Sequence, residues 1–122
     1  KLLEAKNKLE TAKADLSSTK ANIISQMAEL ESNLQLEKYS LEQSRLRARN
    51  AIYESENKRK EIELNMKKAE ISYKQLQSKK QATEKINKAS LRQAELKVEQ
   101  ALLKMKRAEE DLKKLTVTSP AD

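Results

Sequence analysis

The sequence predicts an all-α protein, a long antiparallel two-helix coiled-coil hairpin. Ala, Glu, Lys, Arg and Leu make up 73 of the 122 residues, an excess that is typical of coiled coils and long helices. The chain has no Gly and one Pro, so nothing interrupts helix over residues 1–119. Apolar residues recur at alternating steps of three and four, which is the core spacing of a coiled coil.

The same composition excludes several classes of function. The chain has no Cys and no His, which removes the commonest zinc, haem and Cys–His catalytic chemistries. Without Gly, the phosphate-binding loops of nucleotide enzymes cannot form. No apolar run approaches the roughly 18 residues that a membrane span requires. We therefore expect a structural protein that is not an enzyme and has no cofactor or metal.

The first helix is predicted over about residues 1–55. One row of apolar residues repeats every seven positions, and Ala5 and Ala12 begin a second row three residues on; the first row is Leu2, Leu9, Leu16, Ile23 and Leu30. After Leu30 the row steps by four to Leu34 and then resumes sevens at Leu41 and Ala48. This step is a stutter, which locally unwinds a left-handed supercoil.

The second helix is predicted over about residues 61–115. Its apolar stripe near the C-terminus runs without a miss through Leu91, Ala94, Val98, Ala101, Met105, Ala108, Leu112 and Leu115. An earlier stripe comprises Ile62, Met66, Ala69, Tyr73 and Leu76. Between them residues 78–90 are polar, and we expect only Ile86 and Ala89 to continue the seam. The three Met residues lie on the stripes and are interpreted as core filler.

Two arrangements fit these stripes, one continuous helix or a hairpin. The stripes match in a hairpin when Leu2 faces Leu115, Leu16 faces Ala101 and Leu41 faces Leu76. The chain would then reverse within a tip at about residues 56–60, which lacks apolar residues. Asn57 tolerates the left-handed conformation that ends a helix, and Ser55 or Asn57 could cap the second helix.

Positive charge is concentrated toward the predicted tip. Residues 45–88 carry 13 basic and 6 acidic side chains, whereas the remainder is balanced. We predict partner binding at the tip, by Asn57, Lys58, Arg59 and Lys60, because a basic tip attracts an acidic or anionic partner. The plainer alternative is a solvated coiled-coil face. Nucleic-acid binding is not expected, because the basic residues surround the helix and only three Tyr could stack on bases.

The last residues predict a change of architecture. Residues 116–118 have β-branched strand character, and Ser119 precedes Pro120, which favours extended backbone. We expect residues 116–122 to begin a truncated β domain, and the start at Lys1 in mid-pattern indicates a piece of a longer protein.

This tail resembles the junction after the hairpin in HlyD-like membrane fusion proteins, also called periplasmic adaptor proteins. The matching positions are Ala108, Leu112, Leu115, Thr116, Thr118, Ser119, Pro120 and Asp122. The resemblance covers about 15 residues of motif and implies that the truncated domain is lipoyl-like. The family's tip motif, R-x3-L-x6-S/T, is absent. Arg59 lies at the predicted tip, but Glu63 occupies the position of the Leu.

The resemblance implies an adaptor in a bacterial export or efflux system. Such a hairpin would extend from a protein anchored to the inner membrane, in the periplasm or another extracytoplasmic space. It would bridge an ABC or RND-type transporter to a distal partner such as a TolC-like outer-membrane channel, with copies assembled in a ring. The alternative is a scaffold or cytoskeletal coiled coil that forms a parallel dimer.

Overall fold

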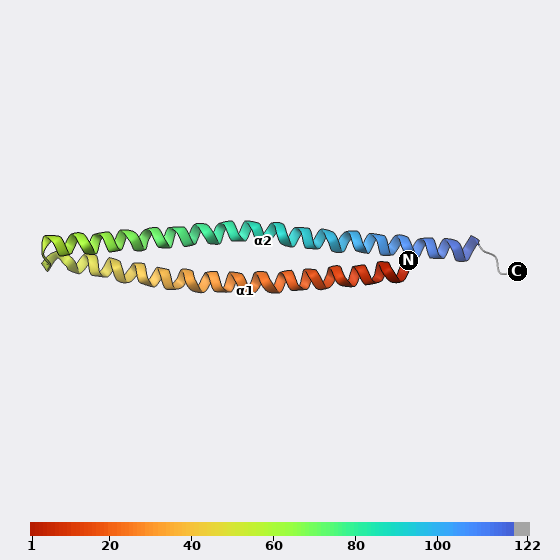
Figure 1. Cartoon of the computed structure of the whole chain (residues 1–122), viewed down its shortest axis with the longest axis horizontal. Helices are drawn as coiled ribbons and strands as arrows, with labels where there is room; N and C mark the ends of the chain where they lie inside the picture. Colours follow the sequence, from red (N-terminus) through yellow and green to blue (C-terminus); the bar gives the residue numbers. More distant parts are fainter. Residues whose placement is uncertain (119–122) are drawn as a thin grey trace. The chain divides into compact units, whose positions relative to one another are not determined.

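The computed structural model describes residues 1–118, which form two long helices and a short connection. Helix α1 spans Leu2–Arg49, the 3-10 helix η1 spans Asn50–Tyr53, and helix α2 spans Glu56–Thr118. The helices pair antiparallel, as Figure 1 shows, so the predicted all-α hairpin is confirmed. The Ala-, Leu-, Lys- and Glu-rich composition favours this helix along its whole length.

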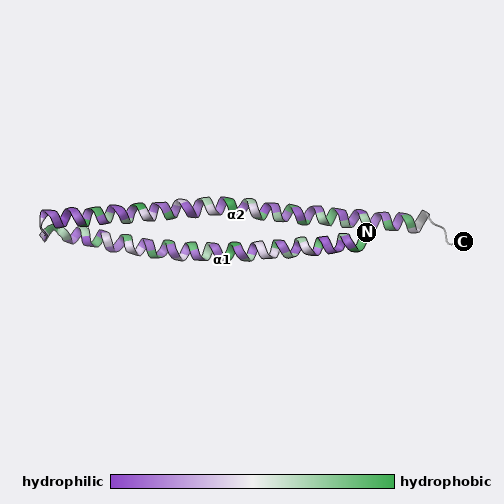
Figure 2. Ribbon diagram, in the orientation of Figure 1, coloured by the Kyte–Doolittle hydropathy of each residue, from purple (hydrophilic) through white to green (hydrophobic). Residues whose placement is uncertain are grey.

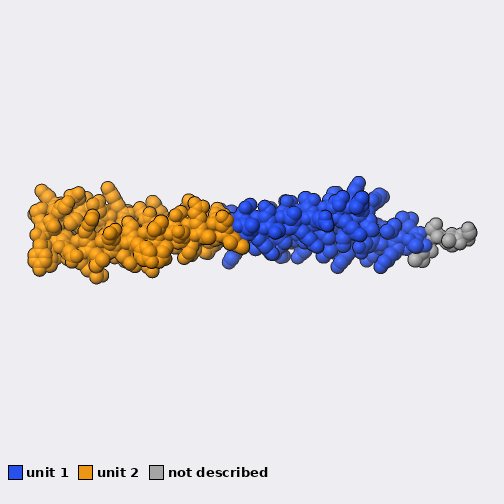
Figure 3. Space-filling view, turned by 90° about the horizontal axis from the view of Figure 1, so that it is seen from below, with its two compact units in different colours: residues 1–23, 86–122 blue, residues 24–85 orange. Residues whose placement is uncertain are grey.

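The chain divides into two units, coloured separately in Figure 3. One unit joins residues 1–23 to the chain from residue 86 onward, and the other is residues 24–85. In each unit a stretch of α1 lies beside a stretch of α2 that runs in the opposite direction (Figure 1). The second unit also contains the chain reversal.

The helices meet along one seam, whose residues are buried or half-buried at alternating steps of three and four. Figure 2 shows hydrophobic residues recurring between hydrophilic ones along both helices. Most residues of the predicted apolar rows lie on this seam, including the three Met residues; the exceptions are exposed and are Ile86, Ala89, Leu112 and Leu115. Among the described residues, the buried apolar side chains all come from α1 and η1; they are Leu9, Leu30, Leu41 and Ala51. The seam residues of α2, among them Leu76 and Leu91, are half-buried.

The predicted register of the two helices is wrong by about one heptad. Glu31 was expected beside Ile86, but its carboxylate lies 2.6 Å from the Lys80 Nζ, and Ile86 is 64% exposed. Registers one heptad apart place the same pattern of apolar residues in contact, so only the position of the turn distinguishes them.

The observed register also changes the end of the seam. Leu2 was predicted to face Leu115. It lines a shallow groove with both Ala108 and Leu115. Leu112 and Leu115, predicted as the last core residues, are exposed. Both leucines nevertheless line the same groove as Leu2.

The extra step of four occurs at a different place from the one predicted. On α1 the seam runs Thr19, Ile23, Met27, with two successive steps of four. On α2 it runs Thr83, Asn87, Leu91, again with two steps of four. The seam therefore bypasses Ile86 and Ala89, both exposed. Each helix carries one such irregularity, so the two stripes remain in phase on either side of it.

The boundaries also differ from prediction. Helix α1 ends at Arg49 rather than near residue 55, and the predicted tip at 56–60 forms the start of α2. Residues 116–118 are helical rather than extended, and the Thr116 hydroxyl donates to the Leu112 carbonyl at 2.9 Å. This bond lets a β-branched hydroxyl residue remain in a helix. Residues 119–122, the rest of the predicted β domain, lie outside the described residues, and that prediction is not tested.

Candidate partner-binding surfaces

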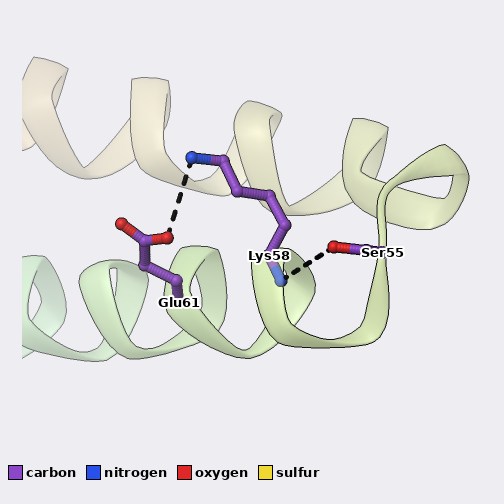
Figure 4. A network of polar contacts seen from close by, with 3 residues as sticks. All are labelled: Ser55, Lys58 and Glu61. Carbon is purple, nitrogen blue, oxygen red and sulfur yellow. Dashed lines mark hydrogen bonds and ion pairs between the residues drawn. The ribbon is translucent and has the colours of Figure 1, made fainter.

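The chain reverses at Glu54 and Ser55, without glycine and without any left-handed residue in the described chain. Glu54 is extended, with φ −88° and ψ 163°, and its backbone N–H donates to the Ala51 carbonyl at 3.0 Å. The Ser55 hydroxyl accepts a hydrogen bond from the Lys58 backbone N–H at 3.3 Å, as Figure 4 shows. Ser55 is therefore the N-cap of α2. The left-handed role expected of Asn57 is wrong, because one extended residue followed by a capping serine reverses the chain.

The four predicted partner-binding residues are consecutive and exposed in the first turns of α2; they are Asn57, Lys58, Arg59 and Lys60. Lys58 forms an ion pair with Glu61 at 3.7 Å, drawn in Figure 4, and Lys60 forms one with Glu56, also at 3.7 Å. Exposed pairs of this kind are weak, so both ammonium groups remain available to a partner. Partner binding by these four residues stays a prediction.

The most exposed apolar side chains of the turn belong to η1, which the sequence interpretation did not include in the site. Tyr53 is 92% exposed and Ile52 is 67% exposed. Ala51, not Tyr53, is the buried residue at this end of the seam. Ile52 and Tyr53 could have been found from the sequence only by placing the turn correctly, because the 3-10 helix rotates them away from the seam.

The outer faces of both helices carry apolar rows of their own, here called the outer rows. On α1 and η1 the outer row is Tyr39, Leu46 and Tyr53, spaced by seven. On α2 within the same unit it is Leu64 and Ile71, also spaced by seven. These positions lie opposite the seam in the heptad pattern. Their signal in the sequence is this second seven-residue repeat, out of phase with the seam.

The seam itself contains a polar stretch on α2, formed by Lys80, Thr83 and Asn87. The Lys80 ammonium donates to the Glu31 carboxylate at 2.6 Å, and this hydrogen bond raises the pKa of Lys80. The Asn87 amide nitrogen is buried and has no hydrogen-bond partner. Polar residues at core positions lower stability but restrict the register that two helices can adopt.

The chemistry of the described residues is that of surfaces. Within residues 1–118 no group of three or more acidic, Cys or His side chains could hold a metal ion. No helix in this range is both long enough and apolar enough to cross a membrane. Comparisons with protein-family models, curated proteins and solved structures find no match to this chain.

Proposed function

We propose that this chain is the helical hairpin of a HlyD-like periplasmic adaptor in a bacterial export or efflux system. The observation that carries the proposal is the antiparallel pairing of two long helices about a short, capped turn. The tail from Ala108 to Asp122 supports it through its resemblance to the hairpin-to-lipoyl junction of that family. A hairpin leaves and re-enters its parent domain at one end, so it can act as a spacer.

In this role the protein works mechanically. Domains outside this chain would hold an ABC or RND-type transporter in the inner membrane, and the turn would face a distal partner such as an outer-membrane channel. The hairpin would lie in the periplasm or another extracytoplasmic space. The family tip motif is missing, because Glu63 occupies the Leu position, so the distal partner would be recognised by other residues.

The outer rows support the assembly of several copies. The two outer rows lie on opposite sides of the hairpin, one on α1 and the other on α2. The row on α1 of one copy can therefore pack against the row on α2 of the next copy. Such head-to-tail contacts generate a ring when their rotation closes. The ring would make the hairpins the wall of a conduit.

The scaffold alternative loses its main geometric argument. A parallel dimer of one continuous helix requires helix through residues 50–60, whereas the chain reverses at Glu54 and Ser55. A scaffold built from antiparallel hairpins would have the same fold but would not bind a transporter or a channel.

Site-specific photo-crosslinking in the producing cells tests the proposal. A photoreactive residue at Asn57, exposed at the start of α2, is expected to capture a channel or transporter protein of the cell envelope. The same residue at exposed Ser17 on α1 serves as the matched control and is not expected to give that product. Capture of cytoskeletal protein alone, or of no envelope transport protein, would overturn the proposal.

A further inference from the structure

We propose that the turn end of the hairpin binds an anionic phospholipid surface, with Ile52 and Tyr53 entering the lipid interface and a collar of basic residues behind them. This inference concerns the same end as the proposed adaptor function but does not rest on it. It requires only the exposed turn and the charge around it.

The apolar part of the surface is η1. Ile52 and Tyr53 are adjacent, strongly exposed and lie at the reversal, where no helix covers them. Tyr is enriched at membrane interfaces, where its ring is buried and its hydroxyl stays hydrated. An aliphatic neighbour adds apolar area that enters the boundary between headgroups and acyl chains.

The basic part lies just behind the turn on both helices. Residues 45–60 carry six basic and two acidic side chains, the acidic ones being Glu54 and Glu56. Arg47, Arg49 and Arg59 take part in none of the ion pairs found in the described chain. The Lys58 side chain extends from the first turn of α2 back along the helix, away from the turn (Figure 4).

This layering matches that of an anionic membrane. An apolar end reaches the acyl boundary while Lys and Arg, one turn behind, remain at the depth of the phosphates. A convex turn also needs no complementary pocket on a fluid lipid surface, whereas a stable protein interface needs roughly 800 Å² of matched surface on each partner. For the turn of a single hairpin, the geometry therefore favours a lipid surface over an acidic protein; a channel would have to be contacted by the turns of several copies together.

The test uses the full chain with single-Trp reporters, since the chain has no Trp. Tyr53→Trp is expected to shift its fluorescence to the blue on adding vesicles that contain phosphatidylglycerol, and not with phosphatidylcholine alone. Tyr39→Trp, exposed on the outer row of α1, is the matched control and should not shift. A shift of both reporters would mean that the helix lies flat on the vesicle and would overturn the proposal.

Two variants separate the contributions, with helicity checked by circular dichroism. Arg49→Glu combined with Arg59→Glu is expected to weaken vesicle cosedimentation by at least about tenfold, because each basic residue near an anionic surface contributes about fivefold. Ile52→Ser combined with Tyr53→Ser should weaken it while preserving its salt dependence. Equal binding to both vesicle types, or no binding, would overturn the lipid proposal. Binding to polyglutamate alone would also overturn it and would indicate an acidic protein partner. Vesicle binding and envelope crosslinking can fail independently, so the two proposals are tested separately.

Discussion

Two stretches of the seam follow the same spacing with different chemistry. At Leu41 an apolar side chain is 4% exposed, although its neighbours along the α1 seam, Glu37 and Ser44, are polar and half-buried. Along α2 from Lys80 to Asn87 the seam positions are a lysine, a threonine and an asparagine. The spacing alone thus maintains helix pairing through both stretches, while their contributions differ. The buried leucine supplies stability, and the polar stretch limits the registers that are available.

Removing the apolar contribution gives the largest expected effect. Leu41→Ala should lower the free energy of unfolding by about 3 kcal/mol, because it deletes a buried side chain and leaves a cavity. Urea denaturation followed by circular dichroism measures this change. The control is Leu36→Ala, at an exposed leucine of the same helix, for which we expect about 0.5 kcal/mol or less. Equal losses in both variants would remove the distinction between seam and surface.

The second prediction is a gain in the free energy of unfolding, from a substitution in the polar stretch. Asn87→Leu should raise the free energy of unfolding by about 1 kcal/mol, because the buried amide nitrogen lacks a hydrogen bond and its burial is costly. Asn33→Leu, at an exposed position of α1, is the control and should change stability little. A loss of stability in Asn87→Leu would show that the amide makes a favourable contact.

The same substitution should relax the register. The observed register favours a disulfide between Leu16→Cys and Ala94→Cys, whereas a register displaced by one heptad favours Leu16→Cys with Ala101→Cys. In the Asn87→Leu background we expect the second pair to oxidise as well. Oxidation of the first pair alone in both backgrounds would count against a register role for Asn87.

The smallest effect concerns Lys80 and alkaline pH. The hydrogen bond to Glu31 raises the pKa of Lys80 above its ordinary value of 10.5, so the folded chain holds this proton more tightly than the unfolded chain. The contribution is fully present below pH 10.5 and is lost as the pH rises through the higher pKa of the folded state. Lys80→Met should lack this part of the alkaline decline in urea titrations, whereas Lys79→Met, at an exposed neighbour, should keep it. Parallel declines in the two variants would exclude a role for the pair.

Much of the fold could be predicted because it depends on periodicity. The helices, the antiparallel arrangement and most seam residues follow from apolar spacing and the lack of Gly and Pro. The register could not be predicted, since a heptad repeat fits itself again after every seven residues. Moving the reversal from residues 56–60 to Glu54 and Ser55 changes the partner of every seam residue.

The candidate site was predicted less completely, for a local reason. Charge placed the basic residues near the turn, but the predicted site left out Ile52 and Tyr53, because their apolarity fits either a seam or an exposed surface. The 3-10 geometry of η1 decides between these, and no residue in the sequence signals it. Thr116 was misassigned as strand because β-branching outweighed a hydroxyl that can bond back to Leu112.

The paired irregularities at Ile23 and Asn87 restrict how such a protein can change its size. Seven residues inserted into one helix alone would shift the register beyond that point by one heptad. Each seam residue there would then face the wrong partner. Insertions of seven residues into both helices, at matching distances from the bend, would keep all the existing pairs of neighbours. They would lengthen the hairpin by about 10 Å. Growth or shortening by evolution or by engineering is therefore expected in discrete, mirrored increments.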